Sequence, residues 1–197
     1  MLSEYEQSQT SKSKTLKKTV QTVFQQAQNC FQQALQQDPD DIYTWDEYAR
    51  VCFNLAHLAS PKESDALWQT TIHAYRRVLF HRDNRLIGAE ALLETTVFLS
   101  MAYAKSKQFE QATEWLSLIQ AIRPQHELPH YARACLISLQ SQSAACDLSE
   151  ALEHLARALQ LASDRGSLAQ AARQDADLQA LRQALPQEFE SVLAGSK

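Results

Sequence analysis

The segment that decides the fold reads Leu99-Ser-Met-Ala-Tyr-Ala-Lys-Ser-Lys-Gln-Phe-Glu-Gln-Ala-Thr-Glu-Trp-Leu116, and Pro124 follows it. Ser100 and Ala112 are small residues that let two antiparallel helices approach closely, while their larger neighbours fill the space around that contact. Pro124 ends the second helix, because proline lacks a backbone N–H and clashes with the preceding turn. The segment therefore predicts a helical hairpin.

A pattern of four residues, with internal offsets of three, four and three, recurs along the chain. Its four occurrences are Phe24, Ala27, Phe31 and Ala34; Trp68, Thr71, Tyr75 and Val78; Phe109, Ala112, Leu116 and Ile119; and Leu148, Ala151, Leu155 and Ala158. Such offsets place the four side chains on one face of a helix. We interpret each set as the second helix of a hairpin, at periods of 44, 41 and 39 residues.

The hairpin pattern resembles the tetratricopeptide repeat (TPR), whose signature is a large residue, a small one, an aromatic, Ala, a bulky residue and Pro. These places are filled in order by Leu99, Ser100, Tyr103, Ala112, Leu116 and Pro124, with Phe109 between the aromatic and the Ala. Trp45, Tyr48 and Ala49 also match, whereas Arg133 stands where a bulky apolar residue is expected. The resemblance spans about residues 22–193, and the periods exceed the roughly 34 residues of the standard unit.

The resemblance implies an all-α fold: a TPR-like right-handed α-solenoid of about four helical hairpins, closed by a C-terminal capping segment. First helices are expected near residues 41–58, 86–106 and 128–142, and second helices near 22–37, 61–81, 109–122 and 148–162. Capping chemistry supports these boundaries, since Ser60-Pro61-Lys62-Glu63 reads as a helix start. Asp147 with Glu150, and Asp38-Pro39-Asp40-Asp41, give similar signals.

Three regions are expected along the chain. Residues 1–14 form a flexible polar N-terminus, with helix beginning near Lys14, and residues 15–165 form the repeat array. Gly166 marks a break before the capping helices and tail over 166–197, which resemble the tail of many bacterial TPR proteins. A solenoid must cover its last apolar face, and the stripe available for this is Leu178, Leu181, Leu185, Phe189 and Val192.

The composition narrows the class of protein. The chain has 197 residues, of which 45% are hydrophobic and only 3 are Gly, and this favours helices over tight β-turns. A formal net charge of -4 argues against nucleic acid as a partner, since that affinity needs a basic face. No secretory signal or apolar run of about 20 residues is seen. We expect a cytoplasmic protein without a membrane span.

The cysteines are Cys30, Cys52, Cys135 and Cys146, and their wide spacing fits neither a zinc knuckle nor a redox pair. Each occupies a position suited to a small apolar residue. We therefore expect four buried free thiols, which favours a reducing compartment.

The run His126-Glu127-Leu128-Pro129-His130 formally matches the H-E-x-x-H metalloprotease motif. Pro129 interrupts the helix on which that motif depends, so we interpret the run as a loop followed by the start of a new helix. A third ligand, Glu150 or His154, would have to come from the opposing helix. With no Gly-rich phosphate loop and no Gly-x-Ser-x-Gly elbow either, we expect no metal, no cofactor and no enzymatic activity.

In TPR proteins the first helices line a concave groove that binds a partner. The resemblance places the groove at Asp46, Glu47, Arg50, Phe53, Val97, Phe98, Met101, Lys105, Tyr131 and Cys135. These residues do not form the Lys/Asn/Arg clamp with which some TPR domains hold a chaperone carboxylate. The expected function is a protein–protein adaptor, scaffold or assembly factor that binds a peptide or helix, with a small-molecule or lipid-binding helical domain as the alternative.

Two further alternatives concern where a partner would bind. Phe98, Met101 and Tyr131 are either open to a partner or covered by a terminal segment of this chain. The arginines Arg76, Arg77, Arg82 and Arg85, with His81, form the densest basic cluster. That cluster either complements the dipole at a helix C-terminus or anchors an acidic partner.

Overall fold

The computed structural model describes residues 2–143 and 146–195, and it describes side chains for all of these except residues 2–14 and 61. Within those ranges the chain forms ten α-helices and two short 3-10 segments, and it has no strand. Helices that follow one another in sequence pack against each other in pairs. The protein is therefore all-α, as the sequence predicts.

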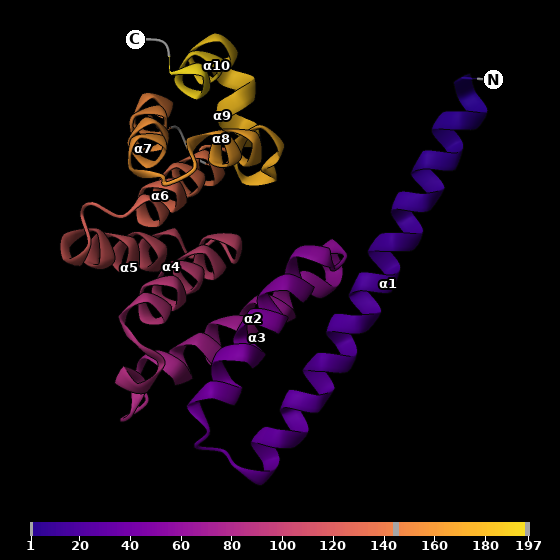
Figure 1. Ribbon diagram of the computed structural model, residues 1–197, viewed down its shortest axis with the longest axis vertical. Coiled ribbons are helices and arrows are strands. Elements are labelled where there is room, and N and C mark those ends of the chain that lie inside the picture. The colour runs from indigo at the N-terminus through magenta and orange to yellow at the C-terminus, as the bar shows by residue number, and fades with distance from the viewer. Residues whose placement is uncertain (1, 144–145, 196–197) are drawn as a thin grey trace. The chain divides into compact units, whose positions relative to one another are not determined.

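The chain divides into two compact units, the first ending at Gly88 and the second starting at Ala89. The first unit holds α1 (Leu2–Gln37), α2 (Ile42–Leu58), α3 (Pro61–Leu79) and η1 (Asn84–Ile87). The second holds α4 (Ala89–Lys105), α5 (Phe109–Ile122), α6 (Glu127–Gln140), α7 (Leu148–Leu161), α8 (Arg165–Gln174), η2 (Ala176–Leu178), α9 (Gln179–Ala184) and α10 (Pro186–Ala194). Figure 1 shows the elements of both units.

Helices α2 and α3 form the first hairpin of the structure, and its ends follow the predicted capping chemistry. Asp41 caps α2 by accepting the backbone N–H groups of Tyr43 and Thr44. At the start of α3, the backbone N–H and the hydroxyl of Ser60 both donate to Glu63, at 3.4 and 2.8 Å. Between the two helices lies an aromatic core that contains Trp68 and Tyr75.

The sequence predicts about four hairpins, and the structure of α1 shows that the N-terminal one of these is absent. Helix α1 is one continuous helix that begins at Leu2 rather than near Lys14, so no turn divides it into two antiparallel helices. Its C-terminal half packs on α2, where the side-chain amide of Gln28 donates to Cys52 Sγ at 3.3 Å. The amide of Gln32 donates to the Tyr48 hydroxyl at 2.9 Å. In Figure 1 the N-terminal half of α1 extends past the ends of α2 and α3.

The predicted close approach in the hairpin of α4 and α5 is confirmed. Ser100 and Ala112 have no exposed surface, and the Ser100 hydroxyl donates to the Ala112 carbonyl at 2.7 Å. Such a hydrogen bond between facing helices requires small side chains at the crossing. The hairpin of α6 and α7 follows, and Asp147 caps α7 as expected.

The C-terminal helices fold back on α6 and α7, so they cover the last hairpin. Leu178, Leu181 and Phe189 are completely buried there. Arg165 donates to the carbonyl of Val192 at 2.8 Å, which ties α8 to α10. Gly166 lies inside α8, and the helix is capped by Asp164 instead.

The cysteine prediction is wrong in part. All four cysteines are free, and Cys52 and Cys135 are buried, but Cys30 is exposed and Cys146 is half-buried. Cys30 is exposed because it lies on a face of α1 that α2 does not contact. None of the helices in the described residues is both long and apolar enough to span a membrane.

Candidate functional site

On α2, the predicted groove residues mostly make contacts within the first unit. The carboxylate of Asp46 lies 3.4 Å from the Arg50 guanidinium, and Asp46 is buried. The ring of Phe53 packs edge-on against Trp68, with centroids 5.4 Å apart. Only Glu47 is classed as exposed among the predicted α2 positions.

On α4 and α6, three of the predicted groove residues belong to the core of the second unit. Val97, Met101 and Cys135 are all less than 10% exposed. Phe98 and Tyr131 are half-buried. Partner binding by these residues stays a prediction.

The C-terminal segment engages this same face. The Tyr131 hydroxyl donates to the Asp175 carboxylate at 2.8 Å, and Lys105 Nζ pairs with Asp177. Burial raises the pKa of the Tyr131 hydroxyl and of the Cys135 thiol, and the nearby aspartates raise both further. Both groups are therefore neutral at physiological pH. The chain's own C-terminal segment thus contacts Lys105, Tyr131 and Cys135 of the predicted groove.

The basic cluster lies around an open pocket in the first unit. The pocket has a volume of about 610 Å³, and its lining is Asp40, Gln69, Ile72, His73, Arg76, Arg77, Phe80, His81 and Arg82. Three of the four predicted arginines line it, whereas Arg85 lies on η1 outside the lining. Three arginines against a single carboxylate make the lining positive.

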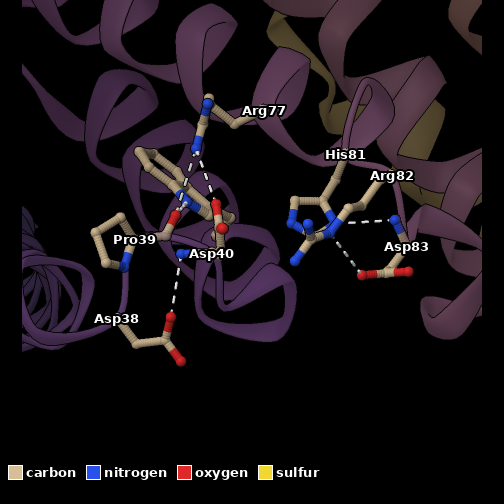
Figure 2. A network of polar contacts seen from close by, with 8 residues as sticks. Asp38, Pro39, Asp40, Arg77, His81, Arg82 and Asp83 are labelled. Carbon is tan, nitrogen blue, oxygen red and sulfur yellow. Dashed lines mark hydrogen bonds and ion pairs between the residues drawn. The ribbon is translucent and has the colours of Figure 1, made fainter.

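Arg77 is held in place by the loop between α1 and α2. Its guanidinium donates to the carbonyl of Pro39 at 3.3 Å and lies 3.9 Å from the Asp40 carboxylate (Figure 2). The indole N–H of Trp45 donates to the same Pro39 carbonyl at 2.8 Å, and the Arg77 guanidinium stacks over the Trp45 ring at 5.3 Å. These contacts fix the guanidinium at the wall of the pocket.

The other cations are less constrained. The Arg76 guanidinium lies 5.7 Å from the ring centroid of Phe80, a residue that is 66% exposed. Arg82 pairs with its neighbour Asp83 at 3.3 Å, and its side chain is 79% exposed. His81 Nδ1 accepts the backbone N–H of Asp83 at 3.1 Å, as Figure 2 shows. The pocket therefore combines one guanidinium that several contacts hold in place with two more exposed ones.

The residues of the H-E-x-x-H match engage separate partners. His126 caps α6, and its Nε2 lies 2.8 Å from a Glu90 oxygen. His130 instead lies with its Nδ1 3.2 Å from Nδ1 of His154. Helix α6 starts after His126, with Pro129 in its first turn, as the sequence predicts. Across the described residues, no group of three or more His, Cys, Asp or Glu side chains could hold a metal ion.

Two functional features of the structure are missing from the sequence-based prediction. Asp175 and Asp177 bind Tyr131 and Lys105 across 44 and 72 residues, and no local pattern predicts contacts over such separations. The stacking of Arg77 on Trp45 is also not predicted, because the two residues lie 32 positions apart in the sequence.

Comparison of the chain with protein-family models, with curated proteins and with solved structures found no match.

Proposed function

We propose that this chain is a non-enzymatic protein-interaction module that holds an acidic peptide segment of a partner protein in the basic pocket of α3. In this proposal the hairpins α2–α3, α4–α5 and α6–α7 are TPR-like repeats that form a right-handed solenoid. The protein acts as an adaptor, scaffold or assembly factor. The predicted repeat spacing and the Ser100–Ala112 contact support the repeat assignment.

The observation that carries the proposal is the lining of the pocket. Arginine presents a planar fork of N–H donors that matches the two oxygens of a carboxylate. Arg76, Arg77 and Arg82 offer three such forks around about 610 Å³, which is room for a short peptide segment. The exposed ring of Phe80 adds an apolar anchor, and aromatic anchors dominate the binding energy of many interfaces.

The alternative of a lipid or an apolar small molecule is less well supported. Sites for such ligands are mostly apolar and enclose the ligand. The pocket of α3 is open, and charged side chains line it. On α4 and α6, the groove positions Lys105 and Tyr131 are engaged by the C-terminal segment, so a partner there would have to displace Asp175 and Asp177.

Fluorescence anisotropy with labelled peptides of mixed Asp and Glu around a single Trp tests the proposal. Arg76→Glu with Arg82→Glu should weaken binding at least ~100-fold. The reversed charges repel the acidic peptide, and the guanidinium donors of both arginines are lost. Lys62→Glu with Lys107→Glu is the matched control, since it changes the net charge equally at exposed positions outside the pocket. Circular dichroism should show intact helices in both variants.

The outcomes separate the candidate sites. Equal weakening by both double variants would mean that the peptide senses only net charge, and the pocket assignment would be wrong. Loss of binding in Phe98→Ala with Tyr131→Ala, but not in the arginine variant, would move the site to α4 and α6.

A further inference from the structure

Helix α1 carries an apolar stripe beside the face that contacts α2. Its members alternate at spacings of four and three residues, and they are Leu16, Val20, Val23, Ala27, Cys30 and Ala34. Leu16 is 66% exposed and Val23 is 58% exposed. Cys30 and Ala34 are also exposed, while Val20 and Ala27 are half-buried. This alternation is the heptad spacing with which one helix packs along another.

The contact with α2 uses a different face of α1. Gln28, Gln32 and Leu35 make that contact, through hydrogen bonds to Cys52 and Tyr48 and through burial of the leucine. At about 100° per residue, Gln28 and Leu35 lie roughly a third of a turn away from the stripe. Packing on α2 therefore leaves the stripe accessible.

The other helices of the repeat pattern show what normally covers such a face. In α3, α5 and α7 the corresponding residues lie under the preceding helix of the hairpin, and Thr71, Ala112 and Ala151 have no exposed surface. In α1, which runs unbroken from Leu2, the corresponding Ala27 is half-buried, and Ala34, the last residue of the pattern, is exposed. The face that a preceding helix covers in three places is thus only partly covered in α1 by the described residues.

We infer that the α1 helix of a second copy of this chain covers the stripe, antiparallel, about a two-fold axis between Val23 and Ala27. In that register Leu16 of one copy faces Ala34 of the other. Val20 faces Cys30, and Val23 faces Ala27. Every larger side chain meets a smaller one, and this is the arrangement by which facing layers interdigitate without voids. The contact uses the same surface on both copies, so it closes at two.

A parallel pair fits the sequence less well. It would place Leu16 against Leu16 and Ala34 against Ala34, so one end would be crowded and the other left with a gap. The charges favour the antiparallel pair as well. Lys17 lies at one end of the stripe, and Asp38 follows its other end. An antiparallel pair brings opposite charges to the same ends, whereas a parallel pair brings like charges together.

The stripe from Leu16 to Ala34 is about 27 Å long at 1.5 Å per residue. A single helix pair of this length lies at the small end of specific interfaces. The dimer should therefore dissociate on dilution, and its stability should depend on the protein concentration.

Sedimentation equilibrium of the full chain over a range of concentrations tests the dimer. Val23→Glu places a charge at the centre of the stripe and should weaken association at least ~100-fold. Thr22→Glu is the matched control, because it adds the same charge at the next residue on an exposed, different face. The control should associate like the unmodified chain. A chain that stays monomeric throughout, or a Val23→Glu variant that associates normally, would overturn the inference.

Disulfide trapping tests the register. Val20→Cys should form an intermolecular disulfide with the native Cys30 under mild oxidation, and peptide mapping should identify that bond. Val20→Cys with Cys30→Ala should not cross-link through position 20, since antiparallel copies place these positions about 15 Å apart. Rapid Cys30–Cys30 cross-linking of the unmodified chain would instead show a parallel pair, and the antiparallel assignment would be wrong.

Discussion

Helices α1 and α5 carry the same four-residue pattern in different environments. In α5, Ala112 and Leu116 have no exposed surface because α4 packs over them. In α1, the corresponding Ala27 and Phe31 are half-buried, and α2 contacts only one side of the helix. The pattern predicts a helix with an apolar face in both cases. It does not predict what covers that face.

The difference arises from the chain that precedes each helix. Residues 106–108 form a turn before α5, where Lys107 has a positive φ of 60°. Helix α1, in contrast, runs unbroken from Leu2 past Phe24, so no turn precedes the pattern there. A hairpin needs both an apolar face on its second helix and a turn before that helix. Helix α1 has the apolar face but no such turn.

The largest effect expected from this comparison concerns Ala112 and Ala27. Ala112→Arg should lower the free energy of unfolding by roughly 3–5 kcal/mol, because a long charged side chain has neither space nor a partner beside Ser100. Ala27→Arg should cost less than ~1 kcal/mol in the monomer, since its side chain reaches solvent. Urea denaturation of both variants measures the difference. Equal losses would show that the two faces are packed alike.

Thiol labelling contrasts the same two environments in one experiment. At dilutions where the chain is monomeric, Cys30 on the exposed face of α1 should react with a thiol reagent at least ~100-fold faster than Cys52 and Cys135. Burial removes reagent access to the latter two and also raises the pKa of both thiols. Mass spectrometry of the partly alkylated native protein gives the order. Early labelling of Cys52 would mean that α1 does not stay packed on α2.

A third test measures how much the C-terminal segment, which packs on α6 and α7, contributes to stability. The pair of Lys105 and Asp177 has side chains that are 18% and 9% exposed, whereas those of Arg173 and Glu190 are 45% and 55% exposed. Asp177→Ala should lower the free energy of unfolding by about 2 kcal/mol, because it leaves the Lys105 ammonium poorly solvated and unpaired. Glu190→Ala should lower the free energy of unfolding by less than ~1 kcal/mol, because its ion pair with Arg173 is exposed to solvent. Thermal melts with limited trypsin digestion measure both, and identical behaviour would show that this pair does not secure the segment.

Much of the fold follows from local chemistry in the sequence. The capping residues Ser60 and Asp147 start α3 and α7 where predicted, and α5 ends before Pro124. The occupant of the α4 and α6 face could not be predicted, since Tyr131 and Asp175 meet across 44 residues. Long-range contacts of this kind depend on how the C-terminal helices pack rather than on any local pattern. The basic cluster was recognisable, but the pocket around it needs the Pro39 loop and Trp45, which come from other elements.

The smallest effect is a pH dependence from the contact between α6 and α7. His154 is half-buried, and its pKa lies below the ordinary value of 6.5, chiefly because burial disfavours the charged ring. His130 and Arg133 lower this pKa further, while Glu150 and Glu153 oppose the shift. The Nδ1 atoms of His154 and His130 lie 3.2 Å apart, so one ring must donate to the other. This hydrogen bond is lost when both rings are protonated.

Because the unfolded chain binds this proton more readily than the folded chain does, stability should fall as the pH drops through 6.5 towards the folded pKa. His154→Asn removes the group, so its free energy of unfolding should change less than that of the unmodified chain between about pH 7.5 and pH 5.5. Urea denaturation at several pH values measures the slope, and NMR titration of the His154 ring measures its pKa directly. A ring that titrates above 6.5 would reverse the sign of the dependence and would mean that the negative charges of Glu150 and Glu153 outweigh burial.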